Sequence, residues 1–267
     1  MVFNYKKILV IGATSGIGKG YTEKFIEDGI KVIVAGRRKE RLDALVETYG
    51  KDKVEAVQLD ITLLNQIPKF VLDTTSAHPD LDCIFINSGI QRAFDFSKPE
   101  TVDLSILDEE VMTNYTAYIH LTLAFIPHLQ KQENQTSLIY TSSGLALVPV
   151  ARCLNYCATK AALHSFILCL REQMRDGPGN IKVIEIFPPA VQTELHDERH
   201  QPDIKNGRAI GMPLDEFIEE SWEGLVRGEE QIAVGMAATA FNGFEALKQA
   251  TFHKMNDMIK GIERRNE

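Results

Sequence analysis

Through its first 190 residues, the chain alternates short runs of apolar, β-branched residues with longer amphipathic segments. Most of the short runs are apolar on successive residues, as expected of parallel strands that helices cover on both faces. They predict strands over 7–11, 31–35, 54–59, 82–86, 137–141 and 182–187. The intervening segments predict helices near 17–28, 39–49, 63–76, 103–131 and 155–175. This alternation predicts an α/β fold: a doubly wound, mostly parallel sheet with helices on both faces and ligands at the carboxyl ends of the strands.

The C-terminal part of the chain departs from this alternation. Residues 194–213 are polar and predict a long loop with some helix, of the kind that often forms a lid. A helix near 214–227 and a short strand over 231–234 follow. The last thirty residues carry apolar side chains at helical spacing, which predicts core packing or a subunit contact for Phe241, Phe244, Leu247, Phe252, Met255 and Ile259. We interpret 1–267 as one domain, in which 194–267 carries the substrate loop and a C-terminal helical region.

The charge balance of the chain excludes some classes of partner. Lys and Arg number 29 against 37 Asp and Glu, a formal net charge of −8. Without an excess of basic side chains to neutralise phosphates, we expect no nucleic-acid surface. No run approaches the ~20 apolar residues of a membrane span, and no signal-peptide pattern opens the sequence. We therefore expect a cytoplasmic protein without a membrane partner.

The four cysteines are open to two interpretations. Cys153 and Cys157 lie four apart on a predicted helix, which is a possible metal-binding pair. The alternative is that all four are buried, reduced thiols. Because no second cluster completes a metal site, we favour the thiols and expect no metal.

A glycine-rich turn follows the first predicted strand and opens the first predicted helix. Glycine lets a backbone turn sharply and approach a pyrophosphate closely, while the helix N-terminus supplies free N–H groups and a positive dipole potential. The position after a first strand favours phosphate binding over an ordinary turn. The residues of this candidate site are Gly12, Thr14, Ser15, Gly16, Ile17 and Gly18.

The glycine spacing, Gly-x-x-x-Gly-x-Gly, resembles that of the short-chain dehydrogenase/reductase family, whose fold is a single Rossmann-type domain. Two further segments are similar to the cofactor side of that family. Asp60, followed by Ile61, comes after the third predicted strand, where the family has an acidic residue that contacts adenine. Asn87-Ser88-Gly89 follows the fourth predicted strand and resembles the family's Asn-Ala-Gly turn. An ordinary strand-ending turn is the alternative for this segment, and both roles can hold together.

The end of the second predicted strand bears on the choice of nicotinamide cofactor. This strand end normally meets the adenosine ribose, where an acidic residue accepts hydrogen bonds from both hydroxyls and repels a 2′-phosphate. Here it is followed by Arg37 and Arg38, with no acid. Two guanidinium groups can hold a phosphate dianion through forked, charge-assisted hydrogen bonds. We therefore expect NADP(H) in preference to NAD(H), although Arg38 can alternatively be a solvated basic residue.

The chemistry is predicted to centre on Tyr156 and Lys160, which lie four apart and so share one face of a helix. A nearby ammonium favours the phenolate and lowers the pKa of tyrosine from about 10 toward neutrality. Ser143 precedes Tyr156 by thirteen residues, the spacing typical of the family, which implies that it bonds the substrate oxygen; Ser142 is the competing candidate. Asn114 matches the family asparagine that supports a water-linked proton relay to the lysine, with a bond to helix backbone as its alternative role.

The segment after the sixth predicted strand resembles the family's Pro-Gly-x-Val-x-Thr sequence. The resemblance implies cofactor contacts for Pro188, Val191 and Thr193, the last two facing the nicotinamide carboxamide. Pro189 replaces the family glycine and stiffens this loop. The resemblance spans roughly residues 6–195.

Together the motifs imply an NADP(H)-dependent oxidoreductase that transfers a hydride between nicotinamide and a carbonyl or secondary alcohol. Tyr156 acts as the general acid/base, and Lys160 also holds the nicotinamide ribose. The extended branch of the family, which acts on sugar nucleotides, usually has Gly-x-x-Gly-x-x-Gly and a longer chain, so the sequence disfavours it. A non-catalytic NADP(H)-binding sensor or scaffold is the alternative, since fold alone does not fix function. The habit of the family implies a homodimer or homotetramer.

Overall fold

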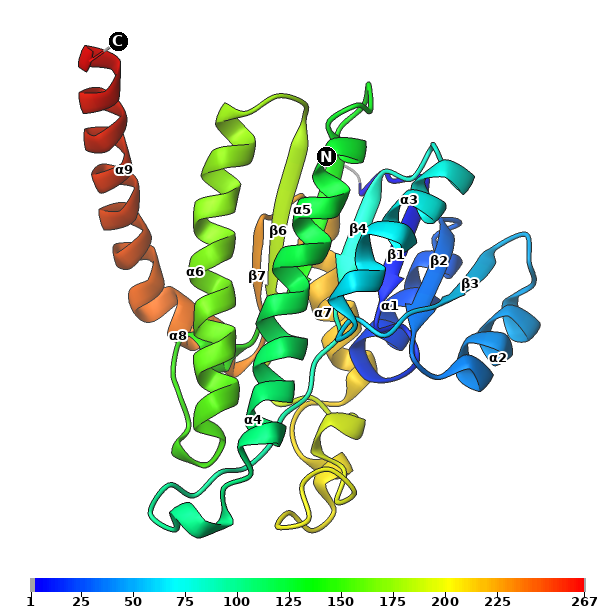
Figure 1. Cartoon of the computed structure of the whole chain (residues 1–267), viewed down its shortest axis with the longest axis vertical. Coiled ribbons are helices and arrows are strands. Elements are labelled where there is room, and N and C mark those ends of the chain that lie inside the picture. Colours follow the sequence, from blue (N-terminus) through cyan, green and yellow to red (C-terminus); the bar gives the residue numbers. More distant parts are fainter. Residues whose placement is uncertain (1–2, 267) are drawn as a thin grey trace.

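A single parallel sheet runs through the molecule in the strand order β3-β2-β1-β4-β5-β6-β7 (Figure 1). The computed structural model describes residues 3–266, with side chains as far as residue 262. The strands are β1 (Lys7–Ile11), β2 (Lys31–Gly36), β3 (Val54–Gln58), β4 (Cys83–Ile86), β5 (Thr136–Thr141), β6 (Ile181–Phe187) and β7 (Gln231–Ala233). The order reverses between β1 and β4. Such a switch point, at the carboxyl ends of the strands, is where doubly wound sheets bind ligands.

Helices cover both faces of the sheet (Figure 1). One face packs against α1 (Gly16–Glu27), α2 (Lys39–Tyr49) and α7 (Leu214–Arg227). The other packs against α3 (Ile67–Ala77), α5 (Ala117–Leu129) and α6 (Leu154–Asp176). In β1, Ile8 and Val10 enter the first core, whereas Leu9 and Ile11 enter the second. This two-sided burial explains why the strands are apolar on successive residues, and it confirms the predicted fold class.

The predicted helix over 103–131 is present but contains an irregular turn. It consists of α4 (Leu104–Val111), a π-helical turn over Met112–Thr116, and α5. A π turn inserts one residue into the helical ladder and redirects the side chains around it. Asn114 lies within this turn and is fully buried.

Two sequence predictions are wrong in the structure. Cys169 is exposed, although Cys83, Cys153 and Cys157 are buried as expected. Core packing is wrong for the C-terminal apolar side chains, because their helix stands outside the two layers (Figure 1), and the alternative of a subunit contact stays a prediction. These side chains lie on a π-helical turn over Phe241–Glu245, which follows α8 (Met236–Ala240), and on α9 (Ala246–Asn266). Of the six, Phe241 and Phe252 are half-buried, and the exposed side chains are Phe244, Leu247, Met255 and Ile259.

The stretch Ala151–Asp176 is long and apolar enough, by length and composition alone, to cross a membrane. Its apolar window is 61% buried inside the structure, where α6 packs against the sheet. The domain core therefore accounts for the apolar character of this helix.

A buried ionic cluster joins the C-terminal region to α6. His164 Nδ1 lies 3.0 Å from both carboxylate oxygens of Glu185 in β6, and His164 Nε2 lies 2.9 Å from Glu245 Oε1. Burial disfavours the imidazolium, but the two carboxylates outweigh it and raise the pKa of His164 to about 9. Burial likewise disfavours the Glu245 carboxylate, but His164 outweighs it and holds the pKa of Glu245 at about 2. The imidazolium is thus the link between Glu245 and the body of the domain.

We predict that this cluster makes stability depend on pH. The pKa of His164 is higher in the folded state than in the unfolded state. Its contribution to the free energy of unfolding, at most about 3 kcal/mol, is therefore complete below about pH 6.5 and is lost as the pH rises to about 9. The free energy of unfolding, measured with urea at pH 6.5 and pH 9, should fall less between these two pH values in Glu245→Gln than in the wild type. Glu219→Gln, an exposed acid paired with Lys24, is the control and should keep the wild-type loss. Equal losses in all three proteins would contradict the assignment.

Candidate active site

The glycine turn between β1 and α1 has the geometry of a phosphate cradle. Gly12 and Gly16 adopt positive φ angles of +93° and +52°, which glycine accepts without strain. A Cβ on Gly18 would lie 2.2 Å from the Gly12 carbonyl oxygen and 2.5 Å from Asn87 Nδ2, so this position requires glycine. Ser15, the N-cap of α1, makes no side-chain capping bond within the described helix. The first N–H groups of α1 therefore suit an anion such as a pyrophosphate.

Asn87, just after β4, ties this turn to the neighbouring strands. Its Nδ2 donates to the Gly12 carbonyl at 3.2 Å, and its Oδ1 accepts from Thr141 Oγ1 at 2.8 Å. Ser88 packs against Gly12, and its carbonyl accepts from Tyr118 Oη at 2.6 Å. The segment is thus a strand-ending turn with a defined structural role, and its cofactor contacts stay a prediction.

The other predicted cofactor residues of the first half lie just after β3 or in the first turn of α1. Asp60 Oδ1 accepts hydrogen bonds from the backbone N–H and the hydroxyl of Thr62. Ile61 is buried in the second core, and Ile17 packs against the first. These three positions shape the strand ends, and their contacts with adenine or phosphate stay predictions.

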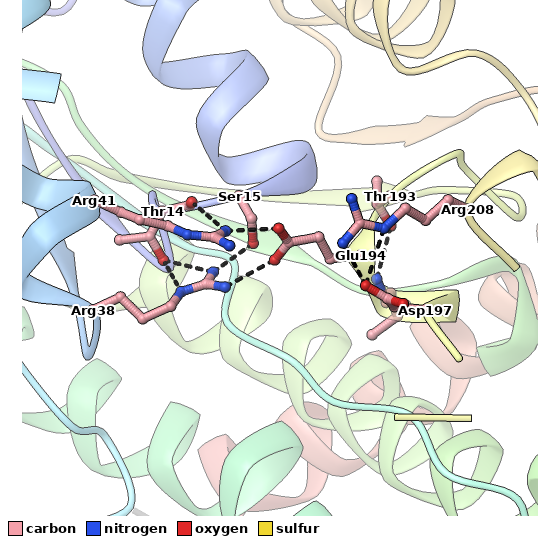
Figure 2. Close-up of polar contacts among 9 residues, drawn as sticks. Thr14, Ser15, Arg38, Arg41, Thr193, Glu194, Asp197 and Arg208 are labelled. Carbon is pink, nitrogen blue, oxygen red and sulfur yellow. Dashed lines mark hydrogen bonds and ion pairs between the residues drawn. The ribbon is translucent and has the colours of Figure 1, made fainter. Parts of the chain in front are cut away.

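Arg38 is bound to the glycine turn (Figure 2). Its Nε and Nη2 donate to Thr14 Oγ1 at 3.1 and 2.8 Å, and Nη2 also donates to Ser15 Oγ at 2.7 Å. The alternative of a merely solvated basic residue is therefore wrong for Arg38. Arg37 instead lies 3.8 Å from Glu109 of α4, with about half of its side chain exposed. The structure brings one of the two predicted arginines to the phosphate turn.

Tyr156, Ser143 and Lys160 come together where β5 ends and α6 begins. Tyr156 lies in the first turn of α6 and is buried, and the Ser143 side chain is near enough to favour its phenolate. Lys160, one turn further on, places Nζ 5.7 Å from the centroid of the Tyr156 ring and donates to the Thr141 carbonyl at 2.9 Å. Ser142 is buried behind them, and its hydroxyl makes no hydrogen bond to any residue that the structure describes. Ser143 rather than Ser142 therefore lies beside the phenol.

The pKa values of this pair differ from the sequence-based expectation. Burial raises the pKa of the Tyr156 phenol above its usual value, and the Ser143 side chain opposes that rise. Burial also lowers the pKa of Lys160 to about 8, against the opposing effect of Glu185 and Glu110. A lysine that is partly neutral near pH 8 stabilises a phenolate less than a full ammonium does. In the chain by itself, the expected lowering of the Tyr156 pKa is therefore absent.

Asn114 fixes the loop after β4. Its Oδ1 accepts from the Ile90 N–H at 2.9 Å, and its Nδ2 donates to the Ile90 carbonyl at 2.8 Å. A Cβ on Gly89 would lie 3.5 Å from Asn114 Oδ1 and 3.9 Å from Lys160 Nζ, so the loop passes close to both groups. The alternative of a bond to helix backbone is thus wrong as stated, because the backbone partner of Asn114 is a loop. The proton relay stays a prediction.

The segment after β6 borders the glycine turn on its other side. Pro188 accepts from the Gly144 N–H at 2.9 Å, and a Cβ on Gly16 would lie 3.2 Å from Thr193. Val191 is buried in the first core, so its side chain packs inward, and its predicted contact with the nicotinamide carboxamide stays untested. Pro189 is accommodated beside Gly235, whose φ is +55° and whose Cβ would lie 3.5 Å from the proline ring.

Sequence reasoning missed three charged residues around the site. Arg41 and Glu194 join the Arg38 cluster (Figure 2). Arg41 has a sequence signal, since it lies three residues past Arg38 on a helix, whereas Glu194 has none. Glu110 of α4 is fully buried and accepts from the Arg92 N–H at 2.8 Å and from Asn155 Nδ2 at 2.7 Å. Through Asn155, Glu110 fixes the start of α6 immediately before Tyr156.

A cavity of about 660 Å³ opens beside the site, which is within the usual range for small-molecule pockets. Neither Tyr156 nor Ser143 contributes to its lining. The loop after β4 and residues 200–203 supply most of its walls. Its charged lining residues are Arg92, Arg152, His200, Asp95, Asp103 and Asp203.

Comparison with known proteins agrees with this geometry. Residues 6–203 match the family model of the short chain dehydrogenases. An uncharacterized oxidoreductase of Bacillus subtilis (strain 168), DltE, is 34% identical over 225 residues, which cover 84% of this chain and 86% of that protein. An NADP-dependent 3-hydroxy acid dehydrogenase of Salmonella typhi, YdfG, is 32% identical over 199 residues, with 73% of this chain and 77% of that protein covered.

Solved structures show the same fold. A short-chain dehydrogenase from Sphingobium yanoikuyae in complex with NADPH superposes with a TM-score of 0.79 at 24% identity, covering 94% of this chain and 95% of that one. The family match covers well over half of the sequence, and the sheet order and glycine turn agree with it. This chain therefore belongs to the short-chain dehydrogenase family of oxidoreductases.

Proposed function

We propose that this protein is an NADP(H)-dependent oxidoreductase that interconverts a carbonyl and a secondary alcohol, with Tyr156 as the proton donor and acceptor. The observation that carries the proposal is the position of the Tyr156 phenol. It is buried, the Ser143 side chain acts on its pKa, and Lys160 lies one helical turn away with Nζ 5.7 Å from the ring. The glycine turn that suits a pyrophosphate is joined to the same strand ends through Asn87.

The roles of the side chains follow from their contacts. The nicotinamide, when bound, supplies the hydride. Ser143 Oγ lies beside the phenol, so a substrate oxygen between them can accept a hydrogen bond from each as negative charge develops on it. A pKa of about 8 lets Lys160 give up or take on a proton near neutrality, which suits the resupply of the tyrosine proton. Asn114 positions the Gly89–Ile90 loop against Lys160.

Two observations support NADP(H) as the cofactor. Arg38 lies directly after β2, where a dinucleotide presents its adenosine ribose, and it contacts Thr14 and Ser15 of the glycine turn. The related Salmonella typhi protein is named as NADP-dependent. A non-catalytic sensor is the less favoured alternative, because Ser143, Tyr156 and Lys160 are all present and grouped.

We expect Tyr156→Phe to lower kcat/KM by roughly 10²–10⁴-fold, the usual contribution of a positioned general acid/base. NADPH binding should be nearly unchanged, because the phenyl ring keeps the packing of the tyrosine. The assay is NADPH oxidation with a panel of aldehydes and ketones. Tyr140→Phe is the matched control, since that buried hydroxyl bonds Thr122 in the core, and it should stay active. A fully active Tyr156→Phe would exclude the mechanism. NADPH binding without any turnover by the wild type would favour the sensor.

We expect Arg38→Ala to weaken NADPH binding by about 10- to 100-fold, which corresponds to the loss of charge-assisted hydrogen bonds worth about 1.5–3 kcal/mol. NADH binding should change little, since it has no 2′-phosphate. Fluorescence titration of both cofactors measures the effect. Arg37→Ala is the matched control: it removes the same charge one residue away, beside Glu109, and should have the smaller effect. Equal losses for the two cofactors in Arg38→Ala would remove the argument for NADP(H).

A further inference from the structure

Two arginines hold one carboxylate beside the glycine turn (Figure 2). Arg38 Nη1 donates to Glu194 Oε2 at 2.8 Å, and Arg41 Nη1 donates to Glu194 Oε1 at 2.7 Å. Each carboxylate oxygen therefore has its own guanidinium. The arginines come from the start of α2, whereas Glu194 comes from the loop after β6, 153 residues beyond Arg41 in sequence. Burial opposes ionisation of Glu194, but the two arginines outweigh it and keep its pKa below the usual value.

The charges and donors around this carboxylate suit a larger anion. Two guanidinium groups face one carboxylate, which leaves an excess positive charge. Arg38 also holds the hydroxyls of Thr14 and Ser15, which lie at the edge of the glycine turn. A neighbouring cavity of about 560 Å³ is lined in part by Thr14, Ser15, Arg41 and Glu194. A phosphate monoester carries a charge of about −1.5 to −2 and three acceptor oxygens, so it matches two arginines better than one carboxylate does.

We propose that Glu194 competes with the 2′-phosphate of NADP(H) for Arg38 and Arg41, and that it thereby adjusts cofactor affinity and links the substrate loop to the cofactor. This inference rests on the proposed NADP(H) function. A carboxylate and a phosphate dianion together place roughly three negative charges against two positive ones, so the phosphate displaces Glu194. NAD(H) has a hydroxyl at that position and leaves the Glu194 pair intact. The preference for NADP(H) over NAD(H) therefore includes the release of the Glu194 carboxylate from the two arginines.

The same carboxylate is one attachment of the substrate loop. At the base of the loop, the Gln192 N–H donates to the Met212 carbonyl at 2.9 Å and the Met212 N–H donates to the Ala190 carbonyl at 2.8 Å. Glu194 then ties the start of the loop to α2. Displacement of Glu194 leaves the base closed and removes the tie between α2 and the turn over Glu194–His196, which is then held from within the loop by Gln201 Nε2 at 2.7 Å from the Leu195 carbonyl. NADP(H) binding is thereby coupled to the segment that leads to the cavity at residues 200–203.

The test is Glu194→Gln, which keeps the size of the side chain and removes its charge. Fluorescence titration should show NADPH binding about three- to tenfold tighter than in the wild type, as expected for the loss of partly exposed ion pairs, with NADH binding unchanged. Two ligands without nicotinamide should behave in the same way: Glu194→Gln should bind 2′,5′-ADP more tightly than the wild type does, and 5′-ADP equally. Glu109→Gln is the matched control, because it removes a charge 3.8 Å from Arg37, and it should leave the NADPH to NADH ratio at the wild-type value.

A second readout follows the loop. Without cofactor, amide hydrogen exchange over Glu194–His196 should be faster in Glu194→Gln than in the wild type. Wild-type NADPH affinity in Glu194→Gln, an equal gain for NADH, or the same gain in Glu109→Gln would each overturn the competition. Unchanged hydrogen exchange would overturn the link to the loop. If the wild type does not prefer NADPH and Arg38→Ala changes nothing, the cofactor assignment itself fails, and that result is distinct from the others.

Discussion

A continuous series of hydrogen bonds joins the phosphate turn to the active-site lysine, and the geometry of the site depends on it. The Asn87 amide donates to the Gly12 carbonyl and accepts from the Thr141 hydroxyl, and the Thr141 carbonyl accepts from Lys160. These residues end β1, β4 and β5, which are adjacent in the sheet, or lie on α6 beside them. A shift of any one strand breaks at least one of these bonds. The reversal of strand order therefore does more than open a crevice, because it brings the glycine turn and Lys160 to one edge of the sheet.

Much of this edge was predictable from sequence, because local patterns encode it. Strands buried on two faces are apolar on successive residues, and the bounds of β1 and α2 agree with the prediction at both ends. The four-residue spacing of Tyr156 and Lys160 fixes their shared helix face. The π turn around Asn114 was not predictable, since a run with helical periodicity gives the same pattern with or without one inserted residue. Its effect is large, because it directs Asn114 to the Ile90 backbone.

The features that sequence did not predict are set by distant parts of the chain. Arg41 and Glu194 are separated by 153 residues, and nothing near Glu194 in sequence indicates two guanidinium partners. The apolar residues of α9 show the opposite failure: the helical periodicity is real, but Leu247 and Met255 are exposed because α9 stands outside the layers. Periodicity predicts that a helix has an apolar face, whereas only the tertiary fold decides whether that face is covered.

Two buried basic residues of α6, Lys160 and His164, lie near the same carboxylate of β6. Lys160 and His164 occupy successive turns of the helix, and Glu185 of β6 raises the pKa of both. The Glu185 carboxylate is shared, since an imidazolium 3.0 Å away offsets part of its field at Lys160. Glu245 in turn stabilises that imidazolium from the other side. Burial lowers the pKa of Lys160, and Glu185 and Glu110 oppose that lowering, so one carboxylate of β6 acts both on Lys160 and on the histidine that holds the C-terminal region.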